Sequence, residues 1–393
     1  MSHPLISRSA DLKQLRDEGY EVEVCGNYLL VHSVPYVNGQ RQIAFGSLVS
    51  ELTLAGDVTV CPHTHLVYFT GDHPSNKDGT PIEQIAHASA TQQLLPGLVI
   101  QHSFSNKPSG GYANYYEKMA RYVDIISSAA KALNQSVDAR TFKPIESSGE
   151  ESVFRYIDTA SSRGGIGSIS GRVAGRRIAI VGLGGSGSYV LDFVAKTPVK
   201  EIHLFDDDLF LQHNAFRSPG AASLEDLKRQ IKKVDHFAEV YTRMRYGVVP
   251  HAVRLDETNV QVLDEFDFVF VCVDRGSARK VVLDALRVRG IPFVDLGMGV
   301  EVTPDEKLFA VCRTTAGTSE RTAHIESRVP LADMDGDGVY TQNIQIAELN
   351  ALNAAFAVIK WKKIAGIYED VDHEHHSTYS TNFHLLTSEE RTA

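Results

Sequence analysis

Two absences in the sequence, paired cysteines and long apolar runs, each exclude a class of protein. The four cysteines, at positions 25, 61, 272 and 312, form no C-x-x-C pair, which argues against a disulfide scaffold and against a zinc site of four thiolates. No apolar stretch approaches the ~20 residues that a membrane helix needs. The first residues show no apolar segment of a secretory signal. We therefore expect a cytoplasmic protein without a membrane partner.

A basic face is also lacking. The 393-residue chain carries a net charge of −10, whereas nucleic-acid binding usually needs a cluster of positive charge. The lysine-rich run at residues 228–233 is mixed with Glu225, Asp226 and Asp235, which is typical of a solvated helix face. We expect no nucleic-acid partner.

The sequence does contain one βαβ unit between residues 176 and 206. An apolar run at 178–181 predicts a buried strand, and a G-x-G-G-x-G turn, an apolar helical segment and a second strand at 201–205 follow it. Glycines let the backbone pass close to phosphates, and a helix N-terminus offers N–H donors to an anion. An acid about 20 residues past the turn can bind ribose hydroxyls. The unit predicts nucleotide binding by Gly182, Gly184, Gly185, Gly187 and Asp206.

The length predicts about two domains. Residues 1–145 read as an α+β domain, which we interpret as a possible partner-recognition module. Residues 146–175 are rich in Ser, Gly and Arg and read as a linker, 176–365 as the nucleotide-binding domain, and 366–393 as a polar C-terminal tail. For the first domain we expect helices at 11–18 and 115–133, strands at 21–24, 28–34, 42–49 and 66–70, and a loop at 103–112.

The second domain alternates strands and helices, which is typical of an α/β, Rossmann-like, doubly wound and mainly parallel sheet. The fold class is therefore α/β, preceded by a smaller α+β domain. We expect strands at 248–255, 268–273 and 291–296, extended chain at 300–313, helices at 224–244, 277–289 and 344–363, and a long loop at 314–338.

The segment after the second strand narrows the function. Asp206 and Asp208 form a D-x-D pair, and after five intervening residues an N-x-x-R pattern begins with Asn214 and ends with Arg217. This pattern resembles the ThiF/MoeB family of adenylyltransferases, which includes ubiquitin-activating enzymes. The family pattern is L-x-D-x-D-x-V-x-x-x-N-L-x-R. The sequence departs from it at Phe210 and Ala215, and at Ser218, where the family usually has Gln.

Two further matches support the resemblance, which covers roughly residues 155 to 365. The family has a lysine that opens a helix after N-x-x-R, and Lys233 fits best, with Lys232 as a close competitor. The family also ends a later apolar strand with an aspartate, and Asp274 fits that position.

The resemblance implies a reaction and a set of roles. It implies ATP-dependent adenylation of the C-terminal carboxylate of a ubiquitin-like or sulfur-carrier protein, with Mg²⁺. Arg217 and Lys233 would contact phosphates, Asp274 would hold the metal, Asp206 would bind ribose, and Asp208 and Asn214 would complete the pocket. It also implies a homodimer in which an arginine reaches across the interface. Arg163 is the first choice for that arginine and Arg155 the alternative.

Many members of the family pass the activated carboxylate to a cysteine, possibly for use by a conjugating-enzyme-like partner. Cys312 is the candidate here, although its apolar surroundings favour a buried, inert thiol. A hydroxyl can accept an acyl group when a base activates it, so an oxyester stays open as a hypothesis. Its candidates are Thr314, Thr315, Thr318 and Ser319, with His324 as the base.

Other clusters and other functions stay open at this stage. Metal sites are conceivable at Cys61, His63, His65 and His73, at 333–338 and at 372–376, but we interpret each as a polar turn, strand entry or tail. The alternative functions are a nicotinamide-dependent oxidoreductase on the same βαβ unit, a non-catalytic partner subunit, and an adenylyltransferase for a small molecule or peptide.

Overall fold

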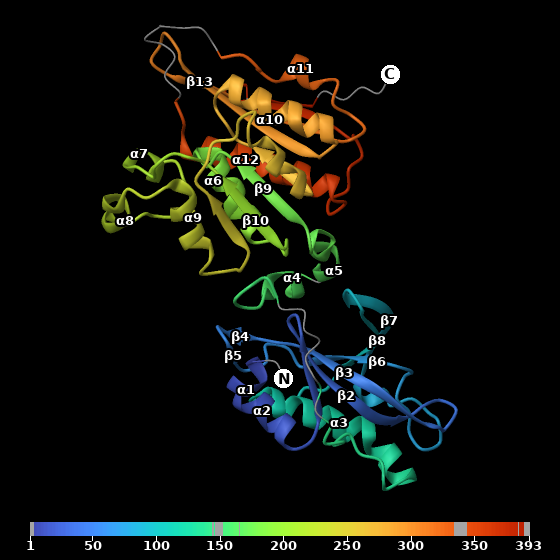
Figure 1. The fold of residues 1–393 in the computed structure, drawn as a ribbon. Helices are drawn as coiled ribbons and strands as arrows, with labels where there is room; N and C mark the ends of the chain where they lie inside the picture. Colours follow the sequence, from blue (N-terminus) through green and yellow to red (C-terminus); the bar gives the residue numbers. More distant parts are fainter. Residues whose placement is uncertain are drawn as a thin grey trace. The chain divides into compact units, whose positions relative to one another are not determined.

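The chain divides into two compact units, residues 1–171 and 172–393 (Figure 1). A computed structural model describes residues 4–143, 145, 152–164, 166–333, 344–383 and 385–388, without the side chains of residues 162 and 163. The division between the units lies inside the segment 146–175 that the sequence analysis interpreted as a linker. No helix in the described part of the chain is long and apolar enough to cross a membrane.

The first unit is a six-stranded antiparallel sheet with helices packed on it. The strand order is β1-β2-β3-β6-β8-β7, and α1, α2 and α3 bury their apolar side chains against one face. Helix α3 begins at Tyr115 because the side chain of Asn114 accepts a hydrogen bond from the backbone N–H of Glu117. The elements are α1 (Pro4–Arg8), α2 (Ala10–Asp17), β1 (Glu21–Cys25), β2 (Tyr28–Val37), β3 (Ile43–Glu51), β4 (Leu54–Ala55), β5 (Val58–Thr59), β6 (Leu66–Thr70), η1 (Glu83–Ile85), β7 (Ala86–Leu95), β8 (Leu98–Ser105), α3 (Tyr115–Leu133), α4 (Thr159–Arg163) and α5 (Gly167–Ser170).

The second unit confirms the predicted α/β fold class. Its eight-stranded sheet has the order β11-β10-β9-β12-β13-β14-β15-β16; the pairs from β11 to β13 are parallel and the pairs from β13 to β16 antiparallel. The elements are η2 (Gly171–Val173), β9 (Arg177–Val181), α6 (Gly185–Ala195), β10 (Glu201–Phe205), α7 (Gln212–Ala215), α8 (Leu224–Arg229), α9 (Lys233–Tyr241), β11 (Val248–His251), η3 (Val260–Glu265), β12 (Phe268–Val271), α10 (Gly276–Arg289), β13 (Phe293–Val302), β14 (Leu308–Gly317), α11 (Ile325–Arg328), α12 (Ala347–Ile364), β15 (His376–Ser380) and β16 (Leu385–Ser388).

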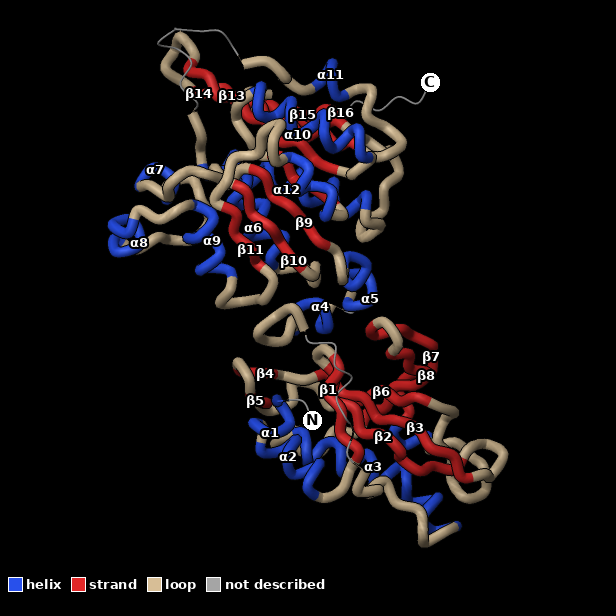
Figure 2. The backbone as a smooth tube through the Cα atoms, viewed as in Figure 1, coloured by secondary structure: helices blue, strands red, loops and turns tan. Residues whose placement is uncertain are grey.

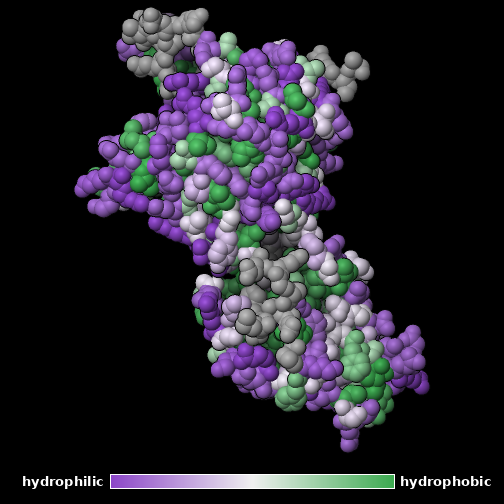
Figure 3. All heavy atoms as spheres, viewed as in Figure 1, coloured by the Kyte–Doolittle hydropathy of each residue, from purple (hydrophilic) through white to green (hydrophobic). Residues whose placement is uncertain are grey.

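Helices cover both faces of this sheet (Figure 2). Along β9, Ile178 and Ile180 point into one core with α6, α9 and α12, whereas Ala179 and Val181 point into the other with α10 and η3. This alternation follows from the two-residue period of a strand. Because the apolar side chains lie between the layers, the visible surface of the unit is mostly hydrophilic (Figure 3). Helices therefore cover both faces of the sheet, so a binding site has room only at the ends of its strands.

The predicted helix at 224–244 is wrong in one respect, because it is two helices. Gln230, between α8 and α9, adopts a left-handed conformation with φ of 48°. The chain there pairs with the segment after β10: Leu209 bridges Lys232, and the N–H of Phe210 donates to the carbonyl of Ile231 at 2.8 Å. This local pairing outweighs helix propensity and makes Lys233 the first residue of α9.

Three predicted irregular segments contain strands. The expected loop at 103–112 begins inside β8, and the expected loop at 314–338 begins inside β14, where Thr314 and Thr315 are buried. The expected C-terminal tail contains β15 and β16. In β14 and β15 the polar side chains are satisfied within the sheet, because β14 has a neighbouring strand on each side. Thr314 bonds Ser377 at 2.8 Å, and Thr315 bonds His376 at 3.0 Å.

Candidate nucleotide-binding site

Two glycines of the turn after β9, Gly182 and Gly187, have no room for a side chain. Gly182 has φ of +90°, and a Cβ there would lie 2.8 Å from the carbonyl oxygen of Cys272. A Cβ on Gly187 would lie 1.9 Å from the carbonyl oxygen of Gly182, so α6 packs directly on the turn. The glycines therefore bring the N-terminus of α6 to the carboxyl ends of the strands, where a phosphate can reach its N–H groups.

Asp206 is held by the backbone on two sides. One carboxylate oxygen accepts the N–H of Leu183 in the glycine turn at 2.7 Å, and the other accepts the N–H of Asp208 at 2.9 Å. The side chain is only 8% exposed. These bonds fix the carboxylate at the end of β10, which is the position the sequence predicted for it.

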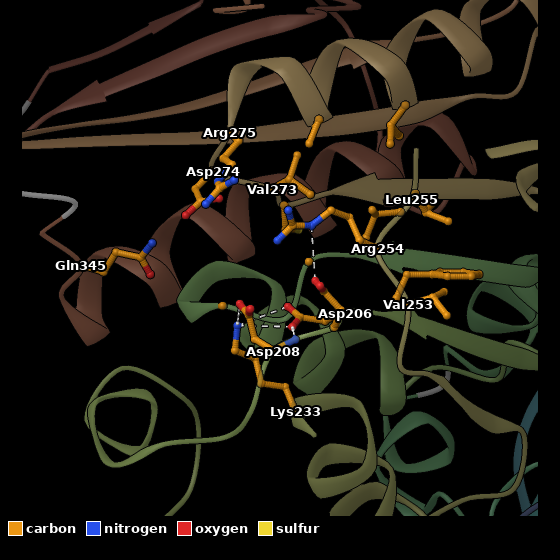
Figure 4. A pocket seen from close by; sticks show the side chains of 18 of the residues that line it. Asp206, Asp208, Lys233, Val253, Arg254, Leu255, Val273, Asp274, Arg275 and Gln345 are labelled. Carbon is orange, nitrogen blue, oxygen red and sulfur yellow. Dashed lines mark hydrogen bonds and ion pairs between the residues drawn. The ribbon is translucent and has the colours of Figure 1, made fainter. Parts of the chain in front are cut away.

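Lys233 is a buried cation between two carboxylates (Figure 4). Its Nζ lies 2.7 Å from Asp208 and 3.3 Å from Asp206, and its side chain is 7% exposed. The hydrogen bond from Lys233 lowers the pKa of Asp208. Its neighbour Lys232 instead donates to the carbonyl oxygen of Asp207 at 2.6 Å. The structure thus brings Lys233, and not Lys232, to the two acids.

A cavity of about 200 Å³ opens at the carboxyl ends of β9, β10 and β12. Arg217 and Asp274 line it together with the glycine turn and the acids. Figure 4 shows Asp274, Asp206 and Asp208 among the lining side chains. Desolvation lowers the pKa of Arg217, while the charges of Asp274 and Asp208 act in the opposite direction. Its buried Nε has no hydrogen-bond partner among the described residues. Among the predicted residues, the lining includes Gly182, Gly184, Asp206, Asp208, Arg217, Lys233 and Asp274.

Asn214 is buried and does not line the cavity. It is 2% exposed, and its Oδ1 accepts the backbone N–H of Leu211 at 2.8 Å. This bond shapes the loop that carries Arg217. Asn214 therefore supports that loop and does not itself face the cavity. Gly185 and Gly187 likewise form the turn beneath the cavity without lining it.

Sequence reasoning missed Gln345. This residue precedes α12, lines the cavity, and its Oε1 accepts the N–H of Gly185 at 3.3 Å (Figure 4). An amide oxygen thus stands at the N-terminus of α6, where a phosphate oxygen would be expected. Nothing in the sequence pattern marks Gln345, because it lies 160 residues from its partner. Arg254 was missed in the same way; its Nε lies 3.4 Å from Asp207 at the edge of the cavity.

The donor set fits one Mg²⁺ ion and no larger metal centre. No group of three or more His, Cys, Asp or Glu residues able to hold a metal occurs in the described ranges. Mg²⁺ commonly binds one or two carboxylates together with substrate phosphates and waters. Asp274, which lines the cavity, is a carboxylate of this kind.

The residues suggested as acyl acceptors are not brought to the cavity. Cys312 is 1% exposed, its Sγ contacts the carbonyl of Leu349, and burial raises its pKa to about 11. Gly317, the last residue of β14, pairs with Phe293 at the amino-terminal end of β13. Thr318 and Ser319 therefore lie at the edge of the sheet formed by the amino-terminal strand ends, whereas the cavity lies at the carboxyl ends. That edge is roughly 15 Å from the cavity along the strands.

Several other residues that the sequence analysis singled out cannot be placed relative to the cavity. The side chain of Arg163, at the end of α4, lies outside the described atoms, and Arg155 belongs to the first unit. Most of the acidic run at 333–338 also lies outside the described residues. In the first unit, His63 bonds Thr53 at 2.9 Å and lies 3.5 Å from Glu51.

Two family matches divide the chain much as the contacts do. Residues 10–159 match a domain of unknown function, DUF6791, and residues 171–305 match the ThiF family. The chain is similar to the adenylyltransferase and sulfurtransferase UBA4 of Yarrowia lipolytica, with 30% identity over 122 residues. That match spans 30% of this chain and 30% of the relative.

Solved structures of similar fold overlap the chain in part. E. coli MccB is 18% identical, covers 58% of this chain and 68% of its own, and has a TM-score of 0.48. MccB with ATP has 17% identity, 58% and 71% coverage and a TM-score of 0.47. PaaA has 16% identity, 56% and 75% coverage and a TM-score of 0.45.

Proposed function

We propose that the protein adenylates a C-terminal carboxylate with ATP, because residues 171–305 match the ThiF family. The proposed substrate is a ubiquitin-like or sulfur-carrier protein. The observation that carries the proposal is the convergence of Arg217, Lys233 and Asp274 on one cavity beside the glycine turn. These groups come from three separate segments: Arg217 and Lys233 supply positive charge to two anionic reactants, and Asp274 offers a carboxylate for the metal.

In the proposed reaction, a carboxylate oxygen of the substrate attacks the α-phosphorus of ATP. The bond from that phosphorus to the bridging oxygen breaks, pyrophosphate leaves, and an acyl-adenylate forms. Because both reactants are anions, catalysis consists mainly of positioning and charge neutralisation. Arg217 would stabilise the negative charge on the α-phosphoryl group, and the fixed carboxylate of Asp206 would bind the ribose hydroxyls.

Lys233 would exchange one partner when nucleotide binds. Its contact with Asp206 is buried, whereas Asp208 is 61% exposed and loses little by turning toward water. A phosphate oxygen can therefore replace Asp208 as the partner of Lys233. Gln345 would give up the N–H of Gly185 to the nucleotide in the same way.

Asp274 would hold Mg²⁺, which supplies positive charge to the phosphates when bound. The arginine contributed across a homodimer, Arg163 or Arg155, remains part of the proposal, as does a recognition role for residues 1–145. Since Cys312, Thr318 and Ser319 do not line the cavity, we expect any thioester or oxyester to form after the adenylate has left it. A conjugating-enzyme-like partner is the proposed acceptor.

The test is ATP–pyrophosphate exchange by the full chain with a panel of ubiquitin-like proteins that end in glycine. Asp274→Asn should lower exchange by roughly 10²-fold or more. The matched control is Asp284→Asn, which changes an exposed acid on α10 and should leave the rate unchanged. Calorimetry should show ATP bound more tightly than NAD. Binding of NAD in preference to ATP would refute the proposal and favour an oxidoreductase, and no binding of either would favour a non-catalytic subunit.

A further inference from the structure

Asp295 is a buried carboxylate in the middle of the sheet, on β13. It is 0% exposed and lies between two arginines: Arg279 Nε is 3.0 Å from one oxygen and Arg313 is 2.6 Å from the other. A buried carboxylate is stable only when it is paired and hydrogen-bonded. One arginine is enough to neutralise the charge of Asp295, so the presence of a second arginine needs another explanation.

One of the two remaining nitrogens of Arg279 reaches the segment that carries Asp274. One donates to the carbonyl oxygen of Val273, immediately before Asp274, and another donates to the carbonyl of Pro330 at 3.2 Å. The guanidinium thus joins β13, the turn after β12 and the chain after α11. Arg313 donates its other terminal nitrogen to Thr315 on β14 at 2.8 Å, away from that turn.

The same turn is supported from its other side. A Cβ on Gly276 would lie 2.3 Å from the carbonyl oxygen of Ala332, so the start of α10 touches that backbone directly. The N–H of Ser277 donates to Asp333 at 3.2 Å. Asp274 stands between the end of β12 and the start of α10, so these contacts and Arg279 hold the backbone on both sides of it.

We propose that Arg279 is a positioning residue, which holds Asp274 in the orientation that binds the metal–phosphate complex. Arg313 balances the charge of Asp295 and does not position Asp274. This inference rests on the proposed function of the cavity. It assigns the fork of Arg279 a role that a lysine cannot fill, because an ammonium offers a single point of charge where three separated oxygens must be bonded.

The test compares Arg279→Lys with the matched variant Arg313→Lys in the full chain. Trp361, the chain's single tryptophan, is 2% exposed in the core of the second unit, so its fluorescence reports the unfolding of that unit. Both variants keep a cation beside Asp295, and we expect similar losses of stability. Only Arg279→Lys should weaken Mn²⁺ binding in the presence of a nonhydrolysable ATP analogue, by about tenfold or more, measured by electron paramagnetic resonance.

The pyrophosphate exchange assay gives a second readout. Arg279→Lys should need about tenfold more Mg²⁺ for half-maximal exchange, while its affinity for metal-free ATP stays unchanged. If Arg279→Lys fails to fold, Arg279→Gln serves in its place, because Arg313 still pairs with Asp295 and no buried charge is left without a partner. An equal loss of Mn²⁺ affinity in the Arg279 and Arg313 variants, or no loss in either, overturns the inference. Absence of exchange in the unmodified protein, with Mn²⁺ binding intact, would count against the proposed function alone.

Discussion

Replacing Lys233 with methionine should destabilise the second unit by about 3 kcal/mol. Removing one partner of a buried ion pair typically costs 3–5 kcal/mol, because the other charge is left in a poorly solvated place. The lower end applies here, since Asp206 keeps its bonds from the N–H groups of Leu183 and Asp208, and the carboxylate of Asp208 can turn to water. Methionine retains most of the apolar stem.

The assay is urea unfolding of the full chain followed by the fluorescence of Trp361. With a slope of about 3 kcal/mol per molar urea, the midpoint should fall by about 1 M. Lys232→Met is the matched control: it removes an adjacent lysine that makes a single bond to the carbonyl of Asp207. That loss should cost about 1 kcal/mol, or about a third of a molar.

A double variant distinguishes two causes of the loss of stability: the lost attraction between Lys233 and its carboxylates, and the unpaired charge left on Asp206. Adding Asp206→Asn to Lys233→Met removes the unpaired carboxylate, so the midpoint should recover part of its fall. The reasoning is refuted if Lys233→Met shifts the midpoint no more than Lys232→Met does. It is also refuted if the double variant is no more stable than Lys233→Met alone.

Three further outcomes are expected. Burial lowers the pKa of Lys118 to about 7 from 10.5, so the unfolded chain binds the extra proton and the stability of the first unit should rise from about pH 7 to about pH 9; Lys118→Met should remove that slope in circular dichroism unfolding curves. Gly187→Ala should cost about 3 kcal/mol or more and abolish ATP binding in calorimetry, because its Cβ would overlap the carbonyl of Gly182. Iodoacetamide should alkylate the exposed Cys61 before the buried Cys312 as seen by peptide mass spectrometry, and faster reaction at Cys312 would contradict its placement.

Local patterns carried most of what the sequence could predict. The glycine turn, Asp206 and Asp274 are each defined by a strand end and its neighbours, so reading along the chain found them, and the structure places all three around one cavity. The choice between Lys232 and Lys233 needed the position of a break between helices, which depends on the pairing of Leu209 with Lys232.

The remaining parts depend on contacts between distant segments. Gln345 reaches the glycine turn from 160 residues away, and Arg279 bonds both Asp295 and the carbonyl of Pro330. No periodicity or motif predicts these contacts, because they depend on the order of the strands in the sheet. The same order separates Thr318 from the cavity, although the sequence places it in the loop where an acceptor was expected.

The order of the last strands also has a consequence for how the chain is made. From β13 to β16 each strand lies beside the one before it, so β15 is the cover for the outer edge of β14. Until β15 has emerged from the ribosome, β14 presents a row of unpaired N–H and C=O groups, which is a template for pairing between nascent chains. Glu374, just ahead of β15, is also the partner of the buried Lys360 at 2.9 Å. A nascent chain stalled before residue 374 would therefore present both an open strand and a stranded ammonium, two features by which quality control could recognise an unfinished molecule.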